Sequence, residues 1–201
     1  MRRVLILAIL ALALPMAAWA DGIELTNQFG SISISTAGIT SMQSQLKSFN
    51  GITNPSGHAI GSVSFSTGAL VSGSLLGGGT FSATGSTFVV IGKGNYGEPK
   101  GTIFTGSFVG PIVWTLVSPP GAKTLVYTLT GTISGMLYDG RIVSGTTTQT
   151  IFSNAGQITA GVGHIRVGDT NLAVPEPGTL GLLGTGLVGI AGMFRRKLLG
   201  A

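Results

Sequence analysis

The sequence contains no cysteine. This absence excludes disulfide bonds, thiol nucleophiles and cysteine-ligated metals, so the fold must depend on packing and backbone hydrogen bonding. Charge is also sparse, because Asp, Glu, Lys and Arg make up only 8% of the 201 residues, and histidine occurs twice. So few ionisable groups leave little material for an acid–base site or a metal cluster, and we expect neither a metal nor another cofactor.

The formal net charge of +5 comes mainly from the two ends of the chain. Two of the eleven basic residues directly follow the initiator Met, and three more stand at 195–197. Residues 21–174 hold six basic and five acidic side chains, which is a net charge of +1. Nucleic-acid binding requires basic side chains clustered on one face, so this balance argues against a nucleic-acid partner.

The first twenty residues have the three parts of a secretory signal peptide. Two arginines precede an apolar run at 4–14, and Ala18 and Ala20 place small side chains where signal peptidase reads the chain. We therefore expect signal peptidase to remove residues 1–20 and the exported body to begin at Asp21. An uncleaved membrane anchor is the alternative, but the run is shorter than the about 20 apolar residues that span a bilayer.

A second apolar run, at 178–194, carries no charge. As a helix it would extend for roughly 25 Å at about 1.5 Å per residue, close to the about 30 Å of a bilayer's hydrocarbon core. Arg195, Arg196 and Lys197 follow at once. Because basic residues favour the cytoplasmic side, we predict one transmembrane helix at 178–194 with the body outside the inner membrane.

Pro175, Glu176 and Pro177 stand just before this run. A Pro-Glu-Pro, a short apolar span and a basic terminus, in this order, resemble the PEP-CTERM sorting signal over residues 174–197. The resemblance implies a transient stay in the inner membrane, where an exosortase-type enzyme removes the tail. It further implies release to the cell surface or extracellular matrix of a Gram-negative bacterium that makes exopolysaccharide. An ordinary stop-transfer anchor is the alternative, although a bare anchor needs no Pro-Glu-Pro.

The body, residues 21–172, lies between the signal peptide and the tail at 173–201, and its apolar residues alternate with Ser, Thr and Gly. Such stretches occur at 62–67, 112–117, 125–130 and 132–138. Period-two alternation with β-branched and aromatic residues predicts half-buried strands. We therefore predict an all-β body, an antiparallel β-sandwich or barrel, flanked by an N-terminal signal helix and the C-terminal transmembrane helix.

Three local features refine this prediction. Asp139-Gly140 between alternating stretches predicts a hairpin with a two-residue turn at Tyr138–Arg141. Residues 39–49 carry apolar side chains at i, i+3, i+7 and i+10, which fits a short helix. Trp114 falls on the apolar face of its strand and is expected in the core, whereas Tyr96 is the best candidate for an exposed aromatic.

Two motifs resemble parts of enzyme sites but lack their partners. Residues 92–97 match G-x-G-x-x-G, yet Glu98-Pro99 follows where a dinucleotide fold needs a helix, so we interpret them as a loop. Ser44 and Lys47 match S-x-x-K, but neither S-D-N nor K-T-G occurs, so we expect both to be solvated.

The two histidines, His58 and His164, are far apart in the sequence. His164, Asp169 and one of many serines could be imagined as a triad, but a triad is recognised by geometry rather than by composition. We instead place His164 on an edge strand, on the same face as Arg166.

These observations favour a non-enzymatic protein with a structural or adhesive role at the cell surface or in an exopolysaccharide matrix. The alternative is a carbohydrate-binding module of the extracellular matrix, with exopolysaccharide as its partner. An exposed aromatic cleft would favour sugar binding, converging carboxylates or a histidine triad would indicate a hydrolase, and sheet faces covered by Ser and Thr would favour the structural role.

Overall fold

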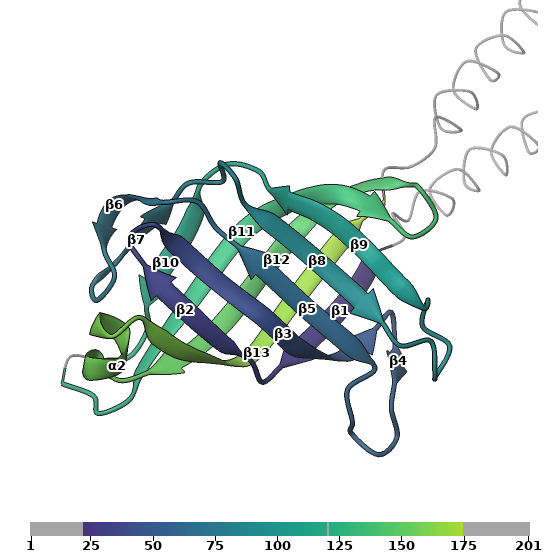
Figure 1. The fold of residues 1–201 in the computed structure, drawn as a ribbon, viewed down its shortest axis with the longest axis horizontal. Helices are drawn as coiled ribbons and strands as arrows, with labels where there is room; N and C mark the ends of the chain where they lie inside the picture. The colour runs from purple at the N-terminus through teal and green to yellow at the C-terminus, as the bar shows by residue number, and fades with distance from the viewer. Residues whose placement is uncertain (1–21, 120, 175–201) are drawn as a thin grey trace, which may run out of the picture. The chain divides into compact units, whose positions relative to one another are not determined.

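The alternation of apolar and polar residues puts one face of each long strand inside a closed β-barrel (Figure 1). The computed structural model describes residues 22–119 and 121–174, which belong to one compact unit, Gly22–Val174. It contains the short helix α2 (Ala155–Thr159). The strands are β1 (Gly22–Gln28), β2 (Ser31–Ser35), β3 (Gly38–Phe49), β4 (Ile52–Thr53), β5 (Gly61–Ser66), β6 (Leu70–Ser74), β7 (Gly78–Phe81), β8 (Thr87–Gly92), β9 (Gly101–Phe108), β10 (Ile112–Leu116), β11 (Leu125–Leu137), β12 (Ile142–Ser153) and β13 (Val162–Ala173).

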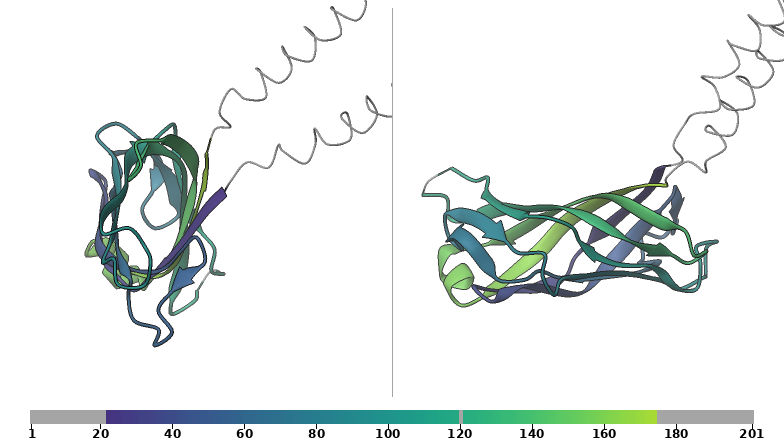
Figure 2. Two further views of the ribbon diagram at one scale, coloured as in Figure 1. Left: turned by 90° about the vertical axis from the view of Figure 1, so that its right-hand side faces the viewer. Right: turned by 90° about the horizontal axis from the view of Figure 1, so that it is seen from above.

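Eight antiparallel strands close the barrel, in the order β1, β3, β5, β8, β9, β11, β12 and β13, and β13 pairs back onto β1. Two shorter strands extend the barrel along its axis. β2 follows β1 between β13 and β3, and β10 follows β9 beside β11. Figure 2 shows the ring of strands end-on. The predicted all-β antiparallel fold is thus confirmed in its barrel form, and the predicted terminal helices lie outside the described residues.

Neighbouring strands of the ring run in opposite directions, so the connections that turn the chain back lie at the two ends of the barrel. One end, called here the terminal end, carries Gly22 and Ala173, which pair with each other. The same end carries β4 and the β8–β9 connection, on the right in Figure 1. The opposite end, called the far end, carries α2 and the β6–β7 hairpin.

Aromatic side chains fill much of the interior. Phe88 stacks on Phe65 at 6.1 Å between ring centroids and meets Phe104 and Phe108 edge-on at 6.1 and 6.0 Å. Such pairs contribute about 0.5–1.5 kcal/mol each beyond the area that they bury. The apolar positions predicted from alternation all lie in or against this core: Val63, Phe65, Ile112, Trp114, Leu116, Leu125, Tyr127, Leu129, Ile133 and Leu137.

A parallel stack of Trp114 on Tyr127 holds the β6–β7 hairpin in place. The ring centroids are 4.3 Å apart and the planes differ by 5°. Trp114 Nε1 donates to the carbonyl of Leu75 and the Tyr127 hydroxyl to that of Leu76, each at 2.8 Å, and both leucines lie between β6 and β7. Burial raises the pKa of Tyr127, which keeps its hydroxyl protonated as a donor.

A buried pair of amides fastens the seam where the first and last strands meet. Asn27 on β1 and Gln149 on β12 both lie opposite Gly168 of β13, which runs between them. Because Gly168 has no side chain, the two amides meet across it through hydrogen bonds of 2.9 and 3.2 Å. Ser44 and Thr147 accept the remaining amide hydrogens at 2.8 and 2.9 Å. All four N–H groups of the pair are therefore satisfied inside the barrel.

The helix predicted at 39–49 is wrong, because these residues form most of β3. Ile39 and Leu46 both face the core although an odd number of positions separates them. A strict two-residue repeat does not allow this, but β3 contains a bulge where its register against β5 shifts between Ser41 and Ser44. The extra residue gives the apolar side chains the spacing expected of a helix. Met42, which a helix would place on the same face as Ile39, points outward and is 75% exposed.

The hairpin predicted between β11 and β12 is confirmed, but its connection has four residues, 138–141. Gly140 has a φ of 84° while Asp139 does not take a positive φ, so the two-residue turn that requires both does not form. The Asp139 carboxylate instead pairs with the Arg141 guanidinium at 2.7 Å. His164 is not on an edge strand, because β13 pairs with β12 on one side and with β1 and β2 on the other.

Candidate functional site

The glycine-rich loop 92–97 binds a carboxylate of the protein itself. The loop connects β8 to β9, so a strand follows it, as expected, rather than a helix. The backbone N–H groups of Asn95 and Tyr96 donate to the Glu98 carboxylate at 3.0 and 2.9 Å, and Glu98 is 3% exposed. These donors are of the kind that a phosphate-binding loop offers to its ligand, and here an internal carboxylate occupies them.

Acid should therefore loosen this loop. Burial alone would raise the pKa of Glu98, but the backbone N–H donors of residues 94–96 and of Glu98 itself outweigh it and hold the pKa below its usual value of 4.5. The stabilisation is present above pH 4.5 and is lost as the pH falls through the lower folded-state pKa. We expect the amide shifts of Asn95 and Tyr96, followed by NMR, to titrate with a midpoint below 4.5. The Glu98→Gln variant should abolish this titration, and a wild-type midpoint at or above 4.5 would contradict the assignment.

Ser44 and Lys47 lie on different faces of β3. Ser44 is fully buried and accepts a hydrogen bond from Asn27, so the prediction that it is solvated is wrong. Lys47 is half-buried on the outer side, where its Nζ donates to the carbonyl of Gly57 at 2.8 Å. An S-x-x-K enzyme requires the hydroxyl and the amine in one site, which this arrangement does not provide.

The ionisable side chains of the barrel do not converge on a catalytic centre. His164 and Asp169 lie on the same strand but five residues apart, which is roughly 17 Å at about 3.3 Å per residue. They therefore cannot belong to one triad. In the part of the chain that the structure describes, no three His, Asp or Glu side chains come together as metal ligands would.

The two aromatics singled out from the sequence lie as predicted, with Tyr96 45% exposed in its loop and Trp114 1% exposed in the core. Phe29, which was not predicted from the sequence, is 58% exposed between β1 and β2. One feature of the sequence could have indicated it: the inward-facing apolar residues have odd numbers in β1, up to Leu25, and even numbers in β2, from Ile32. Such a change of phase indicates a bulge.

Two backbone irregularities turn Phe29, between β1 and β2, and Gln43, in β3, outward. Their φ angles are 53° and 55°, in the left-handed region that bulky side chains avoid. Gln45 N–H donates to the Phe29 carbonyl at 3.1 Å, and Gln43 N–H donates to Ser64 Oγ at 3.0 Å. Strain of this kind costs roughly 1–3 kcal/mol per residue and concentrates at functional sites. This part of the outer face is therefore a candidate binding region.

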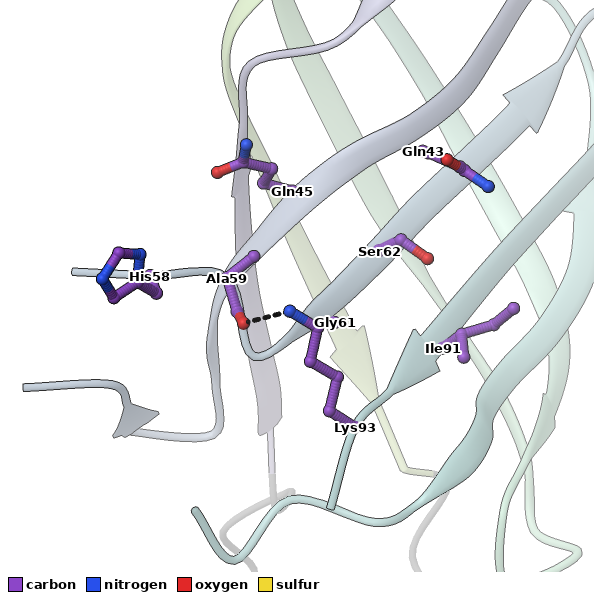
Figure 3. Close-up of a pocket in the computed structure, with 8 residues that line it drawn as sticks. All are labelled: Gln43, Gln45, His58, Ala59, Gly61, Ser62, Ile91 and Lys93. Carbon is purple, nitrogen blue, oxygen red and sulfur yellow. Dashed lines mark hydrogen bonds between the residues drawn. The ribbon is translucent and has the colours of Figure 1, made fainter. Parts of the chain in front are cut away.

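An open groove of about 520 Å³ lies in this region (Figure 3). Strands β3, β5 and β8 and the loops beside them supply its lining: Gln43, Gln45, His58, Ala59, Gly61, Ser62, Ile91 and Lys93. Two amides, a hydroxyl, an imidazole and an ammonium group can exchange hydrogen bonds with a polar ligand. Ile91, which is 45% exposed, adds an apolar contact.

Positive charge gathers beside the groove. Lys93 Nζ donates to the carbonyl of Ala59 at 2.9 Å, as the dashed line in Figure 3 shows. The ammonium of Lys47 lies 5.1 Å from the centre of the Phe29 ring. Among residues 22–119 and 121–174 the one ion pair is Arg141 with Asp139, so neither lysine is neutralised by a carboxylate there.

Rows of hydroxyl groups cover the outer face of β11 and β12. Thr128, Thr130, Thr132 and Ser134 lie opposite Thr150, Thr148, Thr146 and Ser144, respectively. The Oγ atoms of Thr130 and Thr148 are 3.3 Å apart, and Ser144 Oγ donates to Ser134 Oγ at 3.0 Å. Each hydroxyl keeps further hydrogen-bonding capacity for solvent or for a hydrated polymer.

One motif of the chain matches a known family model. The PEP-CTERM protein-sorting motif matches residues 173–197. The chain carries a PEP-CTERM sorting signal. No curated protein and no solved structure matches the chain.

The PEP-CTERM motif supports sorting by an exosortase and passage through the membrane to the cell surface. It spans the predicted sorting residues Pro175, Glu176, Pro177, Arg195, Arg196 and Lys197. These residues, and the predicted signal-cleavage positions Ala18 and Ala20, lie outside the described part of the structure.

In residues 22–119 and 121–174, no helix has both the length and the apolar character needed to cross a membrane. The span predicted at 178–194 lies outside the described residues.

Proposed function

We propose that the chain is a non-enzymatic structural or adhesive protein of the cell surface or of an exopolysaccharide matrix. The observation that carries this proposal is the PEP-CTERM motif at 173–197 joined to a barrel whose outer face presents rows of hydroxyls. The motif supports a route through the membrane to the cell surface. The hydroxyl rows suit contact with a hydrated polymer, because each group can both donate and accept hydrogen bonds.

The barrel interior also favours this role over a transport or catalytic one. Its largest buried side chains, among them Trp114, Tyr127 and Phe88, pack against one another. The interior polar groups Asn27 and Gln149 satisfy each other. An interior packed in this way serves stability, so contact with a partner falls to the outer face and the loops.

A second candidate is a carbohydrate-binding module, and the groove beside Gln43, His58 and Lys93 favours it. The groove offers amide, imidazole and ammonium groups with an adjacent exposed aromatic, Phe29, which are the groups that usually contact a sugar. This candidate differs from the first in that binding depends on one site rather than on the whole surface.

Sorting can be tested by the intact mass of the protein recovered from its host, with inner-membrane, surface, matrix and medium fractions kept apart. We expect a chain that begins at Asp21 and ends near residues 174–178, recovered with the polysaccharide matrix. Replacing Pro175, Glu176 and Pro177 with alanine should leave the chain intact to Ala201 and confined to the inner membrane, because the processing enzyme loses its recognition motif.

Pro111→Ala, a change at an exposed proline of the barrel, is the matched control and should be processed like the natural chain. A wild-type mass running to Ala201 in the inner membrane would overturn the sorting step. Correctly trimmed protein found only in the medium would overturn the matrix role while leaving the sorting step intact.

A further inference from the structure

We propose that the groove and Phe29 together form a binding site for an acidic polysaccharide, a polymer whose sugars carry both hydroxyls and carboxylates. This proposal rests on the proposed function, because it names the kind of matrix polymer that the exported barrel would hold. It assigns the contact to one side of the terminal end, across β3, β5 and β8, rather than to the hydroxyl rows of β11 and β12.

The elements of the site form one continuous strip. Phe29 lies against the ammonium of Lys47, and Lys47 donates to the carbonyl of Gly57. His58 comes next in the chain and lines the groove together with Lys93. A ligand lying along this strip would meet an apolar ring first, then a cation, then the polar groove.

The order of groups fits an acidic sugar. A uronic acid has an apolar C–H face and a carboxylate on the same ring, which correspond to the Phe29 ring and the Lys47 ammonium beside it. The Gln43 and Gln45 amides can bond to the sugar hydroxyls, because each amide offers two donors and an acceptor. Lys93 then faces a further carboxylate along the polymer.

Charge selects an acidic polymer over a neutral one. The ammonium groups of Lys47 and Lys93 each donate a hydrogen bond to a neutral carbonyl, that of Gly57 and that of Ala59. A neutral carbonyl does not cancel the positive charge, so this charge can attract an anionic ligand. Glu98, the acid nearest in sequence to Lys93, is buried and held by the N–H groups of its own loop. Two lysines do not form the clustered basic face that a nucleic acid requires, whereas the groove's amides and its single hydroxyl can bond to the hydroxyls of a sugar.

The strained backbone supplies an independent argument. Phe29 holds a φ of 53° although glycine or asparagine would occupy this conformation with less strain. Its side chain is more than half exposed, so it contributes little to the core. Phe29 thus strains the backbone and adds little to the packing of the core, and contact with a ligand would explain why this residue stands here.

The test measures retention of the full chain, purified in mild detergent, on columns of immobilised polygalacturonate and of neutral dextran. We expect retention on polygalacturonate that weakens as salt is raised, and none on dextran. The Lys47→Gln/Lys93→Gln variant should bind polygalacturonate about 3- to 10-fold more weakly, the loss expected for two charge contacts at the protein surface. Lys123→Gln is the matched control and should bind normally, because Lys123 is exposed in the β10–β11 connection at the far end.

Phe29→Asn separates binding from folding. We expect it to unfold at the same temperature as the natural chain or higher, since asparagine tolerates this φ, and yet to bind polygalacturonate several-fold more weakly. Lowered thermal stability together with unchanged binding would show that Phe29 serves the fold and would remove it from the site.

Equal retention on dextran, equal retention on immobilised duplex DNA, or an unaffected double-lysine variant would each overturn the proposal. The matrix role stands or falls separately, on the fractionation described above. A chain that binds polygalacturonate but is absent from both the cell surface and the matrix would overturn the proposed function alone, whereas a matrix-bound chain without this binding would overturn only the site.

Discussion

Replacing Gly168 with alanine is expected to lower the free energy of unfolding by about 3 kcal/mol, a large part of a typical domain's stability. A methyl group at this position would clash with Gln149 Oε1 and with Asn27 Oδ1. It would therefore force the two amides apart and leave buried donors and acceptors without partners. Chemical denaturation followed by circular dichroism measures the change.

Gly22→Ala is the matched control, because nothing lies within 4 Å of its added methyl group and it sits in the same β1–β13 pairing. Its unfolding free energy should change by no more than about 0.5 kcal/mol. A loss below about 1 kcal/mol for Gly168→Ala would show that the seam does not depend on the amide pair.

A double-mutant cycle separates the clash from the hydrogen bonds. Asn27→Leu alone should cost about 2–3 kcal/mol, since it strands the Gln149 amide in the interior. Adding Gln149→Leu should recover much of that loss, because two apolar side chains of similar shape no longer demand partners. Additive losses in the two single variants would contradict the pairing.

Replacing Trp114 with alanine is expected to cost about 3–5 kcal/mol, the usual range for removing a large buried aromatic. The change removes the stack on Tyr127 at 4.3 Å and the hydrogen bond to the Leu75 carbonyl. Because these contacts hold the β6–β7 hairpin, the substitution should speed hydrogen exchange at the hairpin's backbone amides more than at those of β11. We expect this difference even under conditions in which the barrel stays folded. Hydrogen exchange read by mass spectrometry measures this difference.

Val113→Ala provides the control on the same strand, since Val113 points outward and is 47% exposed. It should cost well under 1 kcal/mol and leave hairpin exchange unchanged. Tyr127→Phe keeps the stacked ring but loses the bond to Leu76, so about 1 kcal/mol is expected. Uniformly faster exchange over all strands in the Trp114 variant would mean that the stack supports the whole barrel rather than this hairpin.

The strands at 112–117 and 125–130 were predictable because their alternation is uninterrupted, so each inward position follows from the one before it. The residues at 39–49 were misread for the opposite reason. The bulge near Ser41 moves the residues that follow it to the opposite face of the strand. The apolar residues then have the same spacing as on one face of a helix, so spacing alone does not distinguish a helix from a bulged strand.

The candidate site was the least predictable part of the molecule. Tyr96 could be placed in a loop by its glycine-rich neighbours, but Phe29 reads as an inward-facing residue until the bulge is known. Lys47 meets Gly57, the neighbour of His58, only because the β3–β5 connection folds back onto the outer face, where the Gly57 carbonyl accepts the lysine's hydrogen bond. Contacts of this kind are made in three dimensions and leave no periodic signal.

The sequence by itself determined the absence of thiol chemistry, the alternating strands, and the PEP-CTERM motif at 173–197. These features depend on residue identity and on neighbours along the chain. The tertiary structure alone decided that the strands close into a barrel, that Gly168 admits the Asn27–Gln149 pair, and that Phe29 faces solvent. Closure brings the first and last strands together, and the register of that pairing depends on side chains far apart in the sequence meeting across it.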